Sequence, residues 1–205
     1  LETIANLADE FADIDMLPVC ADFASDAFDL PEAVLQTSRR LVYFPGSTIG
    51  NFTPDARRDL LARIADLAGP NGFALIGIDL QKPAAILEAA YNDPQGLTAA
   101  FNLNVLARIN RELGGDFDLD RFTHRAVYNA TANRIEMHLV SESKQSVTLD
   151  GQTFDFERGQ TICTEYSHKF SVEGFTSEAA AAGLKRQPVW TDACGWFDVV
   201  LFEVG

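Results

Sequence analysis

The sequence predicts an α/β protein whose sheet is interrupted by an inserted α+β segment. Strand-like apolar segments alternate with helical segments up to about residue 82, and this alternation resumes in residues 172–205. Between them, residues 83–171 read as two helices followed by a series of strands with hairpin spacing. We therefore assign residues 1–82 and 172–205 to one α/β domain and residues 83–171 to an inserted domain.

Two short apolar segments near the start are predicted to be strands. Residues 18–21 precede Asp22 and read as the end of one strand. Residues 40–44 form the next, which Pro45 and Gly46 end because proline and glycine favour turns. Both strands would therefore carry polar or glycine residues at their carboxyl ends.

The following segment carries a helix with clear end signals. Thr53 is a good cap, and Pro54 suits the first helical position because its missing N–H would have no partner there. Gly69 ends the helix. One face is apolar at Leu60, Leu61, Ile64 and Leu67. Residues 72–80 follow as a continuous apolar strand, which is typical of a parallel sheet covered by helices on both faces.

The inserted segment begins with two predicted helices, over residues 84–91 and 97–113. The second helix has one apolar face, made of Phe101, Val105, Ile109 and Leu113. Strands are then predicted over residues 122–129, 134–142, 146–149, 153–156 and 160–170. Asp150–Gly151 joins two of them and is a strong hairpin signal, because both residues tolerate positive φ. A helix over residues 176–182 and a strand over residues 197–204 return the chain to the α/β domain.

Composition and charge exclude several classes of protein. The net charge of −14 argues against a nucleic-acid partner, because phosphate binding needs clustered Lys and Arg. No apolar run reaches the roughly 18 residues of a membrane helix, and no signal peptide is visible. The three cysteines and three histidines show neither zinc nor disulfide spacing. We expect a cytoplasmic monomer that binds no metal, nucleic acid or membrane.

Ligands of open α/β sheets bind at the carboxyl ends of the strands. Three predicted strand ends here carry polar or glycine residues: Asp22, residues 46–51 and Asp79. In residues 46–51, two glycines let the backbone approach a ligand, and hydroxyl and amide side chains offer hydrogen bonds. This loop matches neither a Walker loop nor the dinucleotide fingerprint, so by itself it is equally an ordinary strand-to-helix connection.

Residues 44–52, Phe-Pro-Gly-Ser-Thr-Ile-Gly-Asn-Phe, closely resemble the signature of histidine-specific α-N-methyltransferases. Further segments resemble the same family in order, namely residues 90–93, 96–102, 109–113, 134–137 and 164–170. The resemblance implies a class I methyltransferase with a partial Rossmann-like sheet, an inserted substrate-binding domain and S-adenosylmethionine as cofactor. The implied reaction methylates the α-amine of histidine and gives trimethylhistidine (hercynine) for ergothioneine biosynthesis.

The resemblance also implies roles for the matching residues. Asn51 and Tyr91 would hold the α-amino and α-carboxylate groups of histidine. Glu165 and Ser167 would read the imidazole ring, since a carboxylate accepts an N–H and a hydroxyl donates or accepts. The same pocket would be lined by Thr98, Phe101 and Met137. No general base is evident, and a neutral amine bound from solution would need none.

For the cofactor, the resemblance implies that Asp22 and Phe23 hold the adenine, with the carboxylate accepting its amino group. Gly46 would lie beside the reacting centre, where its small size leaves room. Complete members of the family carry two earlier strands, a glycine-rich cofactor loop and an acidic residue for the ribose, and none of these precedes Leu1. We therefore expect a carboxy-terminal fragment that is weakly active or inactive on its own.

Other readings stay open on sequence grounds. A methyltransferase of the same fold could act on another amino acid or amine, or the insertion could bind histidine-like ligands without catalysis. A nicotinamide oxidoreductase fits the α/β pattern alone, although the dinucleotide glycine pattern is absent. Taken singly, each residue also has an ordinary structural interpretation. Glu165 could be a surface residue and Tyr91 could pack a helix end. Asp22 could cap a helix, and Met137 could belong to the core. Their joint occurrence in the family pattern favours the site.

Overall fold

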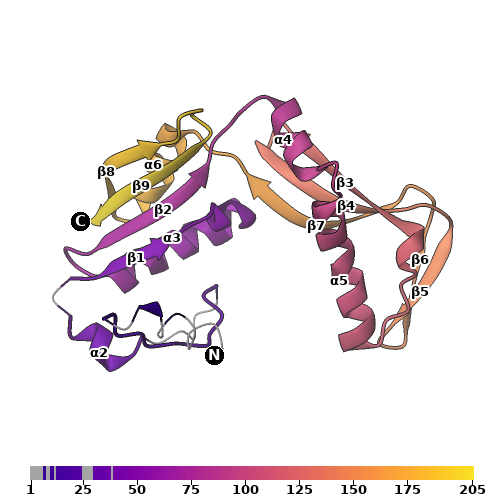
Figure 1. The fold of residues 1–205 in the computed structure, drawn as a ribbon, viewed down its shortest axis with the longest axis horizontal. Coiled ribbons are helices and arrows are strands. Elements are labelled where there is room, and N and C mark those ends of the chain that lie inside the picture. The colour runs from indigo at the N-terminus through magenta and orange to yellow at the C-terminus, as the bar shows by residue number, and fades with distance from the viewer. Residues whose placement is uncertain (1–6, 8–9, 12, 25–29, 38) are drawn as a thin grey trace.

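The computed structural model describes the chain except residues 1–6, 8–9, 12, 25–29 and 38. Its elements form two groups, as Figure 1 shows. One group is a four-stranded sheet with its helices, built from the two ends of the chain. The other contains the strands and helices of residues 84–168. Two stretches of chain join the groups, one after residue 79 and one after residue 168.

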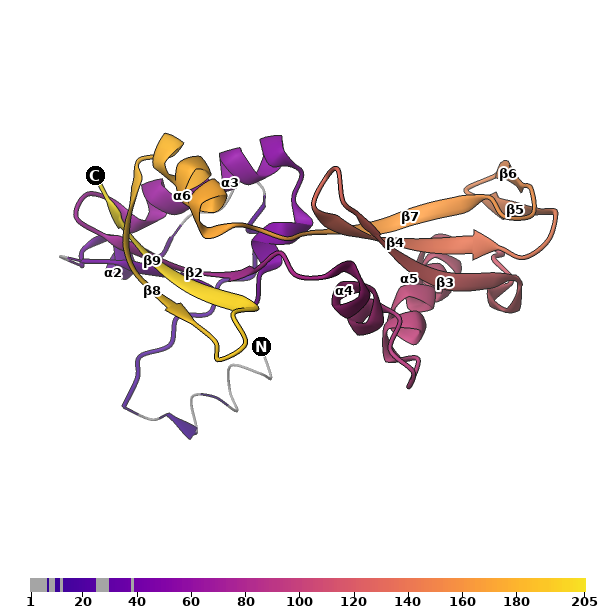
Figure 2. The same cartoon turned by 90° about the horizontal axis from the view of Figure 1, so that it is seen from above.

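The four-stranded sheet is mixed and has helices on one face. Its strands in spatial order are β1 (Leu41–Phe44), β2 (Phe73–Asp79), β9 (Phe197–Val204) and β8 (Leu184–Thr191). Its helices are α2 (Glu32–Leu35), the 3-10 helix η1 (Thr48–Asn51), α3 (Pro54–Ala68) and α6 (Val172–Ala181). Strands β1 and β2 are parallel, whereas the other two pairs are antiparallel. Figure 2 shows α3 and α6 on the same side of the sheet.

This sheet differs from the prediction of a parallel sheet between two helical layers. The prediction holds for the β1–β2 pair, but the chain ends in a β8–β9 hairpin, which is antiparallel by necessity. The sequence pattern does not reveal β8, because this strand is polar and contains Pro188. Proline is tolerated there since β8 is an edge strand whose register shifts between Arg186 and Val189.

The helix boundaries follow their capping residues. Thr53 caps α3 by accepting the N–H of Ala56, as predicted. Helix α6 begins before the predicted residue 176, because Ser171 caps it by accepting the N–H of Gly174. Each cap satisfies an N–H group that has no partner within the first turn of its helix. Over the part of the chain that the structure describes, no helix has both the length and the apolar composition needed to cross a membrane.

Residues 18–21, predicted to be a strand, do not form one. A strand needs a neighbour to satisfy its backbone N–H and C=O groups, and among the described residues β1 pairs with β2 alone. The residues that follow are held by ring contacts instead. Phe23 packs edge-on against Phe44 and Phe52, with ring centroids 5.6 Å and 6.2 Å apart.

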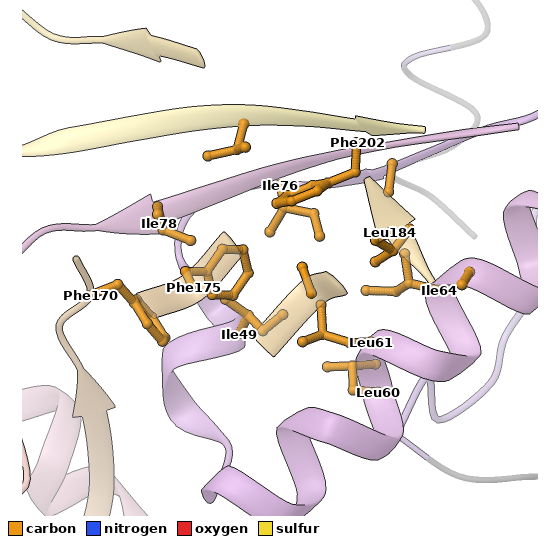
Figure 3. Close-up of a cluster of buried hydrophobic side chains, with 14 residues drawn as sticks. Ile49, Leu60, Leu61, Ile64, Ile76, Ile78, Phe170, Phe175, Leu184 and Phe202 are labelled. Carbon is orange, nitrogen blue, oxygen red and sulfur yellow. The ribbon is translucent and has the colours of Figure 1, made fainter. Parts of the chain in front are cut away.

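The core of the first group lies between the sheet and helices α3 and α6 (Figure 3). Phe175 of α6 contacts Phe170 and Phe202 edge-on, with ring centroids 5.1 Å and 6.0 Å away. Ile49 of η1 is fully buried in the same cluster. The core therefore anchors the loop after β1, which carries the predicted site residues Gly46 and Asn51, and the segment that directly follows β7.

The second group is a three-stranded antiparallel sheet with two helices on one side (Figure 2). Its strands in spatial order are β3 (Phe122–Asn129), β4 (Arg134–Ser141) and β7 (Thr161–His168), and β5 (Gln145–Leu149) and β6 (Gln152–Phe156) form a separate hairpin. Its helices are α4 (Ala84–Tyr91), α5 (Leu97–Leu113) and the 3-10 helix η2 (Leu119–Arg121). Asp150 and Gly151 both have positive φ, which confirms the predicted hairpin turn.

The apolar stripe in the α5 sequence is largely exposed. Phe101 and Leu113 are 64% and 62% exposed, whereas Asn102 and Leu106 are buried against the sheet. The Asn102 amide oxygen accepts a hydrogen bond from the Thr164 hydroxyl at 2.7 Å. A satisfied polar side chain therefore occupies the buried face, and of the predicted apolar stripe Ile109 packs against this core whereas Phe101 and Leu113 do not.

The two groups of elements meet where β2 and β7 end. The Phe170 N–H donates to the Asp79 carbonyl at 2.9 Å, and the Gln81 N–H donates to the Phe170 carbonyl at 3.0 Å. Leu80 and Phe170 form an isolated parallel bridge. The carboxyl ends of the two strands consequently lie side by side, one from each group.

The aromatic contacts predict how much the first core depends on Phe175. Phe175→Ala should lower the free energy of unfolding by about 3–5 kcal/mol, because it removes a fully buried ring and leaves a cavity. Phe154→Ala, at an exposed position on β6, is the matched control and should cost less than about 1 kcal/mol. Urea unfolding followed by circular dichroism measures both. Equal losses would contradict the assignment of Phe175 to the centre of this core.

Candidate active site

A cavity of about 390 Å³ lies at the junction of the two groups. Its walls come from the loop after β1, the ends of β2 and α4, strand β7 with the residue after it, and the start of β9. The lining residues are Gly46, Ser47, Thr48, Asn51, Asp79, Tyr91, Glu165, Ser167, Lys169 and Phe197. The cavity is therefore rich in hydrogen-bonding groups and contains both signs of charge.

The loop after β1 is shaped by two successive left-handed residues, Gly46 (φ 71°) and Ser47 (φ 56°). The Ser47 hydroxyl accepts the backbone N–H of Asp79 at 2.8 Å, which fastens the loop to the end of β2. Gly77 allows this close approach, because a Cβ there would lie 3.1 Å from the Gly46 nitrogen and 2.8 Å from the Phe197 ring. These contacts fix the backbone that leads to Asn51.

The same loop is held against the inserted sheet at Gly50. The His168 Nδ1 lies 2.8 Å from the Gly50 carbonyl and must be the donor, because a carbonyl oxygen only accepts. Burial is the main cause that lowers the pKa of His168, so the ring is neutral with its hydrogen on Nδ1. A Cβ on Gly50 would approach the His168 carbonyl oxygen to 2.9 Å, so the two backbones meet too closely for any larger residue.

Lys169 is the most connected residue of the cavity. Its side chain is fully buried, and its Nζ lies 2.8 Å from Asp79 Oδ2. The same ammonium donates to Ser167 Oγ at 2.8 Å and to Tyr91 Oη at 3.0 Å. The hydroxyl groups of Tyr91 and Ser167 are also hydrogen-bonded to each other at 2.8 Å. Lys82 holds the second oxygen of Asp79, so this carboxylate is paired on both sides.

Glu165 stands on β7 opposite Met137, where the register between β4 and β7 shifts. Its carboxylate makes no hydrogen bond or ion pair within the described part of the chain. Burial raises the pKa of Glu165, and the positive charge of Lys169 acts in the opposite direction. The site thus contains a partly buried carboxylate that accepts no hydrogen bond from the described residues and can accept one from a ligand.

Five of the ten residues proposed from the sequence meet in this cavity: Gly46, Asn51, Tyr91, Glu165 and Ser167. Met137 does not line it, because its side chain is 3% exposed and packs in a small core with Leu87, Ala126 and Ile135. The alternation of β4 turns Met137 toward α4, which is the core reading of this residue.

Thr98 and Phe101 also lie outside the cavity lining. Thr98 belongs to the first turn of α5, where its N–H donates to the Asp93 carboxylate at 2.8 Å. The hydrogen bonds from Thr98 and Leu97 lower the pKa of Asp93 to about 2. Phe101 lies on the exposed stripe of α5, since the helix buries the side that carries Asn102. The rotation of α5 about its own axis therefore decides that neither side chain lines the cavity.

The proposed cofactor residues Asp22 and Phe23 lie near the cavity but not in its lining. Phe23 is 47% exposed beside Phe44, the last residue of β1, and its carbonyl accepts a hydrogen bond from Arg63 at 3.1 Å. Asp22 accepts the N–H of Ala24 at 2.9 Å. The pair is thus placed at the carboxyl end of β1, next to the loop that forms one wall of the cavity.

Sequence reasoning did not single out Lys169 or Phe197 as site residues. One signal could have indicated Lys169. It is a single lysine between His168 and Phe170, directly after a strand whose last two residues are buried. Buried lysines are rare unless they are paired, so such a position suggests a partner elsewhere in the chain. The partner, Asp79, is distant in sequence and was visible only as a polar strand end.

Comparison with known proteins identifies the family. The model of the histidine-specific, S-adenosylmethionine-dependent methyltransferases matches residues 1–204. The histidine N-alpha-methyltransferase of Mycobacterium tuberculosis (strain CDC 1551 / Oshkosh) is 44% identical over 194 residues, which cover 94% of this chain and 59% of the relative. That of Mycolicibacterium smegmatis is 44% identical over 200 residues, covering 96% and 61%. The chain thus spans about three fifths of the length of these relatives.

Solved structures show the same fold at low sequence identity. The PH0226 protein from Pyrococcus horikoshii OT3 aligns with a TM-score of 0.50 at 8% identity, over 100% of this chain and 69% of that chain. At this identity the likeness concerns the fold alone. The match of the family model over nearly all residues carries the assignment, together with the two bacterial relatives. The chain belongs to the family of histidine-specific, S-adenosylmethionine-dependent methyltransferases.

Proposed function

We propose that the protein transfers methyl groups from S-adenosylmethionine to the α-amine of histidine, to give the trimethylated amino acid used for ergothioneine. The observation that carries this proposal is the cavity itself, which joins Asn51 and Tyr91 to Glu165 and Ser167 in a chain of this family. Each pair would bind one end of histidine. Asn51 and Tyr91 offer polar groups for its amine and carboxylate, and Glu165 and Ser167 offer a carboxylate and a hydroxyl for its ring.

The residues assigned to the cofactor fit an adenine and a methyl donor. Adenine needs an apolar surface and an acceptor for its amino group, and the partly exposed Phe23 ring with the neighbouring Asp22 carboxylate offers both. Gly46 keeps the end of β1 open, since the nearest side-chain atom to a Cβ there is 3.9 Å away. When bound, the cofactor supplies a methyl group already activated by a sulfonium centre.

The protein then has to orient the amine and keep its lone pair free. Asn51 suits this task because its amide is neutral and offers both donor and acceptor atoms. Its position is fixed by η1, which Ile49 and Gly50 anchor in the core and against β7. Alignment of bound reactants is a large source of rate enhancement, so the rigidity of this loop is functionally useful.

The opposite end of the cavity accounts for selection of a histidine ring. The Glu165 carboxylate can accept an imidazole N–H, and the Ser167 hydroxyl, which is hydrogen-bonded to Tyr91, can donate to the other ring nitrogen. Asp79 is paired with two lysines and is therefore not available as a base. Ring recognition thus falls to β7, and amine alignment to the loop after β1 together with Tyr91 at the end of α4.

Mass spectrometry tests the reaction directly. The protein expressed from its complete coding sequence, incubated with histidine and S-adenosylmethionine, should convert histidine stepwise to mono-, di- and trimethylated products. Leucine, which lacks the ring, serves as the control substrate and should remain unmodified. Calorimetry with histidine, with and without S-adenosylhomocysteine, tests the alternative, because an enzyme should bind both ligands. A protein that binds histidine but never methylates it would be a binding module. Methylation of leucine would refute selection of the ring.

Glu165→Ala should reduce kcat/KM for histidine about 100-fold, because the ring N–H would lose its charged acceptor. The fold should persist, since the carboxylate makes no hydrogen bond within the described residues. Glu157→Ala is a matched control, because Glu157 is an exposed carboxylate of the same segment paired with Lys144. Steady-state kinetics and thermal unfolding measure both variants, and normal activity of Glu165→Ala would rule out the ring-reading role.

The raised pKa of Glu165 predicts the acid side of the pH profile. Only the ionised carboxylate accepts the ring N–H, so kcat/KM should fall as the pH drops through this pKa, at a higher pH than for an ordinary Glu, about 4.3. Protonation of the substrate ring near pH 6.5 adds its own decline. Glu165→Gln should remove the first ionisation and retain the second. Identical acid limbs in both proteins would show that Glu165 does not govern binding.

A further inference from the structure

Lys169 uses every hydrogen-bond donor that it has. An ammonium group carries three N–H donors and no acceptor. Its three partners are Asp79 Oδ2 at 2.8 Å, Ser167 Oγ at 2.8 Å and Tyr91 Oη at 3.0 Å. The side chain is fully buried, so no solvent competes for these bonds. Both hydroxyl oxygens must consequently act as acceptors toward Lys169.

This arrangement limits what the two hydroxyl groups can offer to a ligand. Tyr91 Oη and Ser167 Oγ lie 2.8 Å apart, so one of the two hydroxyls donates to the other. Two hydroxyl hydrogens exist, and one of them is used in this bond. A single O–H is therefore left for a ligand in the cavity, which both residues line. The Glu165 carboxylate in the same cavity provides acceptor atoms and no donor while it is ionised.

We propose that Lys169 is a positioning residue that sets the polarity of the ring-binding end of the cavity, so that one O–H donor stands beside one carboxylate acceptor. This inference rests on the proposed function. A neutral imidazole has one N–H and one unprotonated nitrogen, which complements this pair. A ring that lacks both groups leaves the hydroxyl and the carboxylate unpaired, and that is how a polar site rejects an analogue of the same size.

Further contacts hold the ammonium and its partner Asp79 in place. It lies 4.8 Å from the centre of the Tyr91 ring, within the range of a cation–π interaction. Asp79 neutralises its charge and is itself fixed by Lys82 and by the Ser47 hydroxyl, which accepts the Asp79 N–H. Lys169 therefore connects the ring-binding end of the cavity to the end of β2, and its position does not depend on the ligand.

Lys169→Met tests the inference, because methionine is of similar length and removes the charge and all three donors. The comparison uses histidine and β-(2-thienyl)alanine, whose five-membered aromatic ring lacks N–H and nitrogen. In the protein expressed from its complete coding sequence, kcat/KM for histidine should fall about 10- to 100-fold, the loss expected for one or two charge-assisted hydrogen bonds. The inhibition constant of the thienyl analogue should change less than about threefold. The preference of the protein for histidine over the thienyl analogue should therefore become smaller.

Lys82→Met is the matched control, because it removes the other lysine on Asp79 without touching either hydroxyl. Lys82→Met should leave the preference for histidine over the thienyl analogue unchanged. If Lys169→Met does not fold by circular dichroism, Lys169→Gln is measured in the same way, since its shorter amide cannot reach all three acceptors and should also narrow the ratio. Equal losses for both ligands would show a merely structural role and overturn the inference. Wild-type protein that fails to methylate histidine would instead refute the proposed function.

Discussion

The buried ion pair between Lys169 and Asp79 is the interaction on which the rest of the site depends. It joins the end of β7 to the end of β2, where the two groups of elements meet, and both of its residues line the cavity. A fully buried ammonium is costly unless its charge is neutralised and its donors are satisfied. Here both conditions are met by residues from the two groups, so neither group can keep this charge buried without the other.

The same junction explains why the loop after β1 has its unusual sequence. Gly50 approaches the backbone of His168 so closely that a Cβ would collide with it, and Gly77 leaves space for the backbone at Gly46. Ser47 adopts a left-handed conformation while its hydroxyl binds the end of β2. The small residues are thus required by the close packing of backbones, and the cavity-lining position of Asn51 follows from this packing.

The division of labour between the two walls has a physical basis. The loop wall is held by the hydrophobic core through Ile49, which makes it rigid and suited to aligning reacting atoms. The inserted wall presents Glu165 and Ser167 two residues apart on β7, where Ser167 is buried and held by Lys169 and Tyr91. Under the proposed function, the rigid loop aligns the amine and β7 reads the ring.

Much of this protein is determined by local sequence signals. Capping at Thr53, the Asp150–Gly151 turn, the limits of α4 and α5 and most strands follow from nearest-neighbour chemistry, because caps and turns satisfy backbone groups within a few residues. The residues at the centre of the site were found through motif resemblance. Strand β8 and the failed strand at residues 18–21 were not predictable, because edge strands depend on which neighbours they pair with. The rotation of α5, the burial of Met137 and the pairing of Lys169 with Asp79 were decided by the tertiary structure alone, since each depends on contacts between segments far apart in the sequence.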